Sequence, residues 1–204
     1  DDHILPRLVT LACAQSTIAE RRAAIVPLAR GRVFELGCGA GFNQPFYDSA
    51  AVTDFAGIEP NGRLLDEARA QAHNRGWSVD IRQAWGEEIP FLSGAFDTVV
   101  STYTLCSVAH PGKVTAELKR ILKLDGTMLF LEHGRAPDAD VYRWQRRIEP
   151  LYRPLAGGCH LTRPVGGMLR AAGLEVEPMG HGYQRKVPRA LGWTEWGIAR
   201  KRGA

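Results

Sequence analysis

Three glycines at alternate positions, Gly37, Gly39 and Gly41, are the first feature of the sequence that could support chemistry. They come directly after the apolar run Arg32–Leu36, which carries a single acid, Glu35. Glycine permits a tight turn and lets backbone N–H groups approach a ligand closely. Such a turn at the end of a strand can therefore hold a polar ligand, although on its own it is equally compatible with a purely structural turn.

A second acid, Glu59, ends the next apolar run and follows Glu35 by 59 − 35 = 24 residues. In a doubly wound sheet an acid at this place can accept hydrogen bonds from both hydroxyls of a ribose. An acid after a strand is also a common helix cap, so this support is modest. The dinucleotide fingerprint needs a glycine where Phe42 stands, which disfavours a nicotinamide enzyme.

Strands and helices that alternate along the chain must position these residues. Apolar runs predict seven strands: Arg32–Leu36, Asp54–Ile58, Ser78–Arg82, Phe96–Ser101, Thr127–Leu131, Leu174–Met179 and Trp193–Ala199. Helical spacing predicts helices within 4–28, from about 62 to 75, around 114–122 and after Pro164, with a turn at Asp125–Gly126. This order predicts a doubly wound α/β domain with a mostly parallel sheet and an antiparallel pair at the C-terminal edge.

The length and composition fit one soluble domain. The chain has 204 residues, 45% hydrophobic and 24% charged, and a net charge of +4, which is too small for a nucleic-acid-binding footprint. Four widely spaced cysteines without a CxxC pair indicate neither a zinc site nor a disulfide framework, and no stretch is apolar enough to span a membrane. We expect a cytoplasmic single domain over 1–204, with a helical cap over 1–30 and an inserted, lid-like segment over 138–163.

Five segments resemble the ordered motifs of the class I S-adenosylmethionine-dependent methyltransferases. They are Glu35–Gly41, Glu59–Asn61, Glu87–Phe91, Phe96–Val100 and Glu117–Leu122. The resemblance runs from about residue 15 to the end of the chain. It implies a Rossmann-like sheet of seven strands with a C-terminal antiparallel hairpin, and S-adenosylmethionine as methyl donor with S-adenosylhomocysteine as product.

The resemblance also implies which residues bind the cofactor. Glu35 and the backbone of the glycine loop would meet its methionine part, Glu59 its ribose, and residues 84–87 its adenine. Trp85 stands where most relatives have an acid, and it could stack on adenine or equally pack in the core. The implied cofactor-binding residues are Glu35, Gly37, Cys38, Gly39, Gly41, Glu59, Pro60, Ala84, Trp85, Gly86, Glu87 and Thr102.

The methyl acceptor must be read from the segments after the fourth and fifth strands. Thr102–Val108, Glu132–His133 and Gly158–Arg163 resemble the thiol S-methyltransferase branch of the methyltransferase-like proteins and its soluble bacterial relatives. A thiol with a pKa of about 8.5 is already partly ionised, so no strong general base is needed. We expect His133 to position or deprotonate a small thiol or sulfide, with Tyr103 and His160 as weaker candidates; equally, His133 could only bond to a loop carbonyl.

The remaining cysteines and the segment 138–156 leave alternatives open. In arsenic methylation clustered protein thiols hold arsenite, and the sequence shows no clustering of cysteines. We therefore expect Cys106 to be a small, buried, hydrophobic residue, and we expect no metal site. Val141, Trp144, Ile148 and Leu151 form one apolar helical face on a segment that also carries arginines.

This segment could be a lid over the acceptor, a helix at a membrane surface or a solvated outer helix, and we favour the lid. A basic amphipathic helix also suits a phospholipid headgroup, so a phosphatidylethanolamine-type N-methyltransferase is the second candidate. A non-enzymatic binding module for the same cofactor is a third. Nucleic-acid methylation is disfavoured, since Ser101–Thr104 stands in place of the motif that holds a flipped base.

Overall fold

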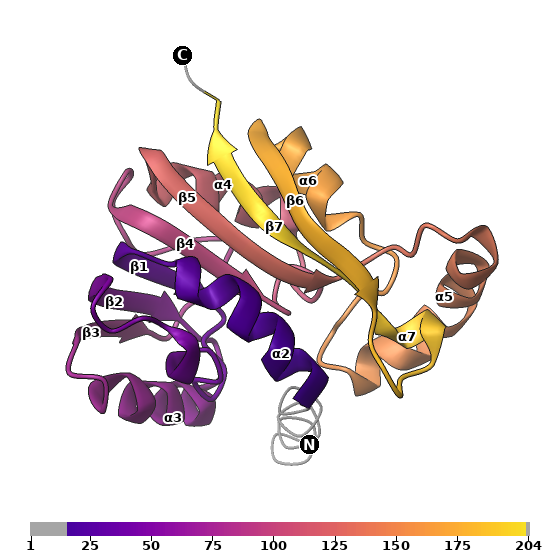
Figure 1. The fold of residues 1–204 in the computed structure, drawn as a ribbon, viewed down its shortest axis with the longest axis horizontal. Coiled ribbons are helices and arrows are strands. Elements are labelled where there is room, and N and C mark those ends of the chain that lie inside the picture. Colours follow the sequence, from indigo (N-terminus) through magenta and orange to yellow (C-terminus); the bar gives the residue numbers. More distant parts are fainter. Residues whose placement is uncertain (1–15, 203–204) are drawn as a thin grey trace.

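One seven-stranded sheet forms the centre of the molecule (Figure 1). The computed structural model describes residues 16–202, so the part of the helical prediction over 4–28 that precedes residue 16 lies outside the described residues, while residues 16–28 are helical. The strands run in the order β3-β2-β1-β4-β5-β7-β6. Their bounds are β1 Gly31–Leu36, β2 Val52–Ile58, β3 Ser78–Arg82, β4 Phe96–Thr102, β5 Leu122–His133, β6 Leu174–Tyr183 and β7 Trp193–Lys201.

The pairing of the strands confirms the predicted fold class. Strands β1 to β5 pair in parallel, and β7 lies antiparallel between β5 and β6. The predicted turn at Asp125–Gly126 is wrong, because both residues lie inside β5. A side chain at Gly126 would meet the Leu122 side chain at 2.7 Å, so glycine is needed there for close packing rather than for a reversal.

Helices cover both faces of the sheet because the buried residues of each strand alternate in direction. Phe34 and Leu36 of β1 pack in one core with α4 (Pro111–Ile121) and α6 (Val165–Ala171). Val33 packs in the other core, which includes residues of α3 (Gly62–His73). Helix α2 (Ser16–Ile25) ends in this second core and crosses the sheet on that side (Figure 1). The strand that bears the glycine loop is therefore fixed from both faces.

The segment after β5 projects beyond the edge of the sheet as α5 (Ala139–Tyr152), followed by a 3-10 turn, η3 (Arg153–Leu155), and it lies beside α7 (Arg189–Gly192) (Figure 1). Its predicted apolar face is only partly buried: Val141 is buried, but Trp144 is 57% and Leu151 77% exposed. Gln145 turns inward instead, accepting a hydrogen bond from the Ala136 N–H. Across residues 16–202, no helix has the length and apolar character needed to cross a bilayer.

Candidate active site

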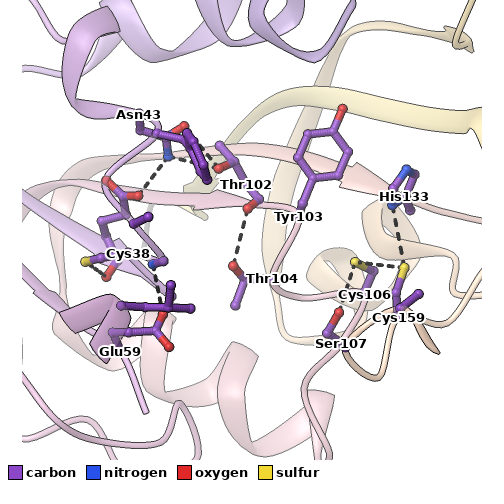
Figure 2. Close-up of a pocket in the computed structure, with 18 of the residues that line it drawn as sticks. Cys38, Asn43, Glu59, Thr102, Tyr103, Thr104, Cys106, Ser107, His133 and Cys159 are labelled. Atoms are coloured by element: carbon purple, nitrogen blue, oxygen red, sulfur yellow. Dashed lines mark hydrogen bonds between the residues drawn. The ribbon is translucent and has the colours of Figure 1, made fainter. Parts of the chain in front are cut away.

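A cavity of about 420 Å³ opens at the carboxyl ends of β1, β2, β4 and β5. Ligands of open α/β sheets bind at the carboxyl ends of the strands, next to the point where the strand order reverses. In this sheet that point lies between β1 and β4. Two groups of residues line the cavity: the glycine loop and the end of β2 at one end, and the loops after β4, β5 and η3 at the other (Figure 2). We call these the donor end and the acceptor end.

The glycine loop at the donor end presents backbone rather than side chains to the cavity. Gly37 and Gly41 have φ angles of +67° and +81°, and a side chain at either would collide with Thr104 or Gln71. Gly39 has a φ angle of +53°, and the space where its side chain would stand is open. Only glycines fit this turn, and the open space above Gly39 suits close approach of a ligand.

Glu59 faces the same loop and has acceptor capacity to spare. Its Oε2 atom accepts a hydrogen bond from the Gly39 N–H at 2.8 Å, and its Oε1 atom one from the Asn61 N–H at 3.0 Å. Burial raises its pKa, whereas these two backbone bonds lower it. A carboxylate offers about four acceptor sites, so two remain for paired hydroxyls such as those of a ribose.

Glu35 lies below the loop in a network that the sequence does not reveal. Its two carboxylate oxygens accept hydrogen bonds from Asn43 Nδ2 at 2.9 Å and from the Tyr47 hydroxyl at 2.7 Å. Arg22 Nε donates in turn to Asn43 Oδ1 at 2.9 Å. Burial raises the pKa of Glu35 to about 7, against the lowering effect of the two hydrogen bonds. No periodicity or motif in the sequence marks Asn43 or Tyr47.

The predicted cofactor residues divide into two groups. Residues on the cavity wall are Glu35, Gly37, Cys38, Gly39, Glu59, Pro60 and Thr102, while Gly41 supports the loop from behind. The other group, Ala84, Trp85, Gly86 and Glu87, does not line the cavity. Trp85 is 70% exposed, so the alternative that it packs in the core is wrong. Adenine binding by this second group stays a prediction.

Glu132 shapes the acceptor end from below. This fully buried carboxylate accepts hydrogen bonds from the Ser101 hydroxyl at 2.7 Å and from the N–H groups of Thr104, Leu105 and Cys106 at 3.0 to 3.1 Å. Burial raises its pKa, and these bonds oppose the rise. One side chain at the end of β5 thus sets the path of the chain that follows β4.

The three candidate catalytic residues do not come together. Tyr103 and His133 line the cavity, with their ring centroids 4.8 Å apart. His160 points away from them and pairs with Glu149, Nδ1 to Oε1, at 3.0 Å. His133 contacts side chains rather than a loop carbonyl: Cys159 Sγ lies 3.5 Å from Nδ1 and Gln184 Nε2 lies 3.2 Å from Nε2. The expected loop carbonyl is thus not the partner found for His133 among the described residues, and a catalytic role for this side chain stays a prediction.

Two of the three described cysteines cluster, contrary to the expectation from the sequence. Cys106 Sγ and Cys159 Sγ are within hydrogen-bonding distance, at 3.4 Å, and both line the acceptor end with His133 (Figure 2). The pKa of Cys159 is lowered by its hydrogen bond with Cys106 and by the nearby His133 imidazole. The pKa of Cys106 is raised by the same sulfur–sulfur hydrogen bond and by burial. Cys106 is buried as expected, but it is not an isolated hydrophobe.

The segment after α5 closes the acceptor end. Tyr152, Leu155, Ala156 and Gly157 line the cavity, although Leu155 is 71% exposed on the outside. The position of this segment agrees with the lid interpretation of 138–163, which remains a prediction about motion.

Comparison with known proteins finds a family model that is similar to the central region. A family described as "Methyltransferase domain" matches residues 34–130. The solved structure of the YcgJ protein from Bacillus subtilis superimposes with a TM-score of 0.66 at 17% identity, covering 92% of this chain and 99% of that one. This likeness concerns the fold.

Two curated relatives are similar to this chain over a little less than two thirds of its length. Thiol S-methyltransferase TMT1B of Rattus norvegicus is 37% identical over 134 residues, which make up 64% of this chain. Phosphatidylethanolamine N-methyltransferase of Cereibacter sphaeroides is 33% identical over 135 residues, 63% of this chain. The matched regions span only 54% and 65% of the lengths of those relatives.

Proposed function

We propose that this chain, a class I S-adenosylmethionine-dependent methyltransferase, transfers a methyl group to the sulfur of a small thiol or sulfide. One observation carries the proposal: the two carboxylates on the cavity wall, Glu35 and Glu59, both lie at the donor end, while the acceptor end offers an imidazole and two sulfurs. An amine or alcohol acceptor needs a group that takes up its proton, whereas a thiol of pKa about 8.5 ionises readily.

The cofactor supplies an electrophilic methyl group on a positively charged sulfonium. In the proposed reaction the acceptor thiol would first lose its proton, its sulfur would form the new S–C bond while the C–S bond of the sulfonium breaks, and that electron pair would stay on the departing neutral thioether. Alignment of the two reactants is the main task of the protein in such an in-line displacement. Glu59 and the glycine loop, which line the donor end, would hold the donor, and Tyr103 with the residues after η3, which line the acceptor end, would enclose the acceptor.

We expect His133 either to position the acceptor or to help remove its proton. The imidazole lies on the cavity wall and is held from behind by Gln184. If its role is deprotonation, the His133→Ala variant loses turnover most strongly at pH 7. The difference in turnover between the wild type and His133→Ala becomes small about one pH unit above the pKa of the thiol, because there the acceptor ionises without help. His73→Ala is the matched control, because His73 is exposed on α3.

The test of the proposal is release of S-adenosylhomocysteine by the purified protein with a panel of acceptors. The panel contains sulfide, methanethiol, a longer alkyl thiol, phosphatidylethanolamine vesicles and a sample without acceptor. Turnover with the thiols but not the vesicles is the expected result. Turnover with the vesicles alone would overturn it, and binding of the cofactor without turnover on any acceptor would indicate a non-enzymatic binding module.

The second candidate is methylation of a phospholipid amine. It is favoured by exposed apolar side chains at Trp144, Leu151 and Leu155, on a segment that also carries arginines such as Arg147. This combination suits an interface with anionic lipid. The candidate requires binding to vesicles that weakens as the salt concentration rises, which co-sedimentation at two ionic strengths measures.

A further inference from the structure

Three potential metal ligands from distant parts of the chain converge at the acceptor end. Cys106 follows β4, His133 ends β5, and Cys159 follows η3. Their ligand atoms, two Sγ atoms and the Nδ1 atom, all lie within 4.8 Å of one another. Neither the glycine loop nor the donor end requires this arrangement, so it needs an explanation of its own.

We propose that Cys106, His133 and Cys159 bind one zinc-class divalent ion, with a fourth coordination position open to the cavity. Zinc bonds of about 2.3 Å to sulfur and 2.0 Å to nitrogen place tetrahedral ligand atoms roughly 3.6 to 3.8 Å apart. The observed separations are 3.4 Å between the sulfurs and 3.5 Å between Cys159 Sγ and His133 Nδ1, while the third pair, Cys106 Sγ and the His133 ring nitrogen, lies within 4.8 Å and would have to close slightly on metal binding. Two cysteines, one histidine and an open position make up one of the known ligand sets of catalytic zinc.

The surroundings of His133 suit a metal ligand. A ligating histidine usually gives its second ring N–H to an acceptor, which leaves the other nitrogen free to bind the ion. The Gln184 side chain lies 3.2 Å from Nε2 and is itself buried. Since the two ends of an amide group can exchange places by a flip, its oxygen can accept the Nε2–H and leave the Nδ1 lone pair directed at the two sulfurs.

The two cysteines are held in register by the backbone around them. The His160 N–H donates to the Cys106 carbonyl at 2.8 Å, and Arg163 Nη1 donates to the Leu105 carbonyl at 2.8 Å. These bonds join the loop after β4 to the loop after η3, so a metal ion would find both sulfurs already near their final places. Little ordering of the chain is then required on binding.

The charges of the site also balance. A divalent ion bound to two thiolates and a neutral imidazole carries no net charge, which suits the buried position of both cysteines. A thiolate in the fourth position would add one negative charge. Arg163 is half-buried and interacts electrostatically with both cysteines, so its guanidinium can offset that charge.

The open position deepens the proposed function and, for this part only, rests on it. An acceptor thiol that enters the cavity loses its proton to solvent, and its sulfur bonds to the ion as a thiolate. The acceptor is then ionised below its ordinary pKa, and His133 acts as a ligand instead of a proton acceptor. The thioether product has no charge and is a weaker ligand, so it leaves.

Titration with Co²⁺ under a phosphine reductant tests the site without relying on activity. Cobalt bound by thiolates gives a charge-transfer band in the near ultraviolet and visible bands typical of tetrahedral geometry. We expect one equivalent of cobalt, displaced by zinc, and a shift of the visible bands when methanethiol is added. Failure of the wild-type protein to bind one equivalent would overturn the metal site, and visible bands unmoved by methanethiol would overturn the open position.

The variants separate the proposed ligands from other cysteines. In the Cys106→Ser and Cys159→Ser variants the charge-transfer band should weaken, and in the double variant it should be lost. Cys38→Ser is the matched control, since Cys38 is also a free, buried cysteine but lies in the glycine loop. Full binding by the double variant would overturn the assignment of ligands, provided that calorimetry shows unchanged cofactor binding and so an intact fold.

Acceptor turnover measured on the same samples distinguishes this inference from the proposed function. Cobalt binding without turnover of any thiol would keep the metal site and overturn the thiol acceptor. If a chelator removes the metal and thiol turnover is undiminished, the proposal of a thiol acceptor stands, but the ion has no role in ionising that thiol. Loss of thiol turnover on chelation, with recovery on addition of zinc, supports both.

Discussion

At the residue scale, the donor end depends on the carboxylate of Glu59. Its oxygens accept hydrogen bonds from the Gly39 and Asn61 N–H groups, and the remaining acceptor sites are those that we predict to bind the ribose of the cofactor. We expect Glu59→Ala to weaken cofactor binding by about 1.5–3 kcal/mol, or roughly tenfold to a hundredfold in Kd, because a charge-assisted hydrogen bond is lost. Isothermal titration calorimetry measures the change.

The control for this experiment is Glu67→Ala. Glu67 is an exposed acid on α3 that pairs only with Arg63, so its replacement should leave the affinity for the cofactor unchanged. If the wild type and Glu59→Ala bind the cofactor with equal affinity, the assignment of Glu59 to the cofactor site is wrong.

At the element scale, the loop after β4 is built on Glu132. Three backbone N–H groups and the Ser101 hydroxyl lose their buried acceptor in Glu132→Ala. We expect the free energy of unfolding to fall by about 3 kcal/mol or more, as for other buried groups left without partners. Urea denaturation checks the value.

Two further variants show whether hydrogen bonding explains that loss. Glu132→Gln retains one oxygen, which accepts three of the four bonds, so it should destabilise less than Glu132→Ala. Glu175→Ala removes an exposed acid from β6 and should cost little. A Glu132→Ala protein as stable as Glu175→Ala would show that the loop does not depend on the carboxylate.

The segment after α5 offers a matched pair of leucines. Leu155 and Leu151 are 71% and 77% exposed, but only Leu155 lines the cavity. We expect Leu155→Ala to raise the KM of an alkyl thiol about fivefold, equivalent to about 1 kcal/mol of lost apolar contact, with no change in the Kd of the cofactor. Leu151→Ala should leave both constants unchanged in steady-state and calorimetric measurements.

If both leucine variants instead lose vesicle binding to the same degree, the segment acts as a membrane-facing surface. The lid interpretation would then be wrong. A lid requires Leu155, which lines the cavity, to behave differently from Leu151, which is only exposed on the surface.

The sequence predicts the parts of this fold that depend on local pattern. All seven strands follow from apolar runs, and the glycine loop follows from the spacing of Gly37, Gly39 and Gly41. The bonds of Glu35 to Asn43 and Tyr47 depend on how the loop folds back, which no spacing rule encodes. The contact between Cys106 and Cys159 joins positions 53 residues apart, so it exists only after the loops are placed.

At the scale of the whole molecule, stability should depend on the ionisation of buried acids. Glu35 has a pKa of about 7 in the folded chain, raised by burial above its ordinary value of 4.5. The folded state therefore binds more protons than the unfolded state between these two values. Its free energy of unfolding is greatest below about pH 4.5 for this group, falls as the pH rises and levels off above about pH 7.

A shift of this size corresponds to about 3 kcal/mol across the window. Glu35→Gln cannot ionise, so its free energy of unfolding should fall less steeply than that of the wild type between pH 5 and 7.5. Burial raises the pKa of Glu132 and Glu59 as well, which leaves some slope in the variant. Parallel profiles for the two proteins in urea denaturation would show that Glu35 is ionised throughout this range.

The cavity wall is divided along the chain as well as across the sheet. The cavity-lining residues up to Leu64 lie at the donor end and those from Tyr103 onward lie at the acceptor end, while Thr102, a predicted cofactor residue, is joined to the first group through Asn43. A duplicated gene could therefore accumulate changes in its second half, and so acquire a new acceptor, while the first half continued to bind the same methyl donor. If the proposed roles of the two ends are correct, the second half of the gene would determine which acceptors the protein methylates.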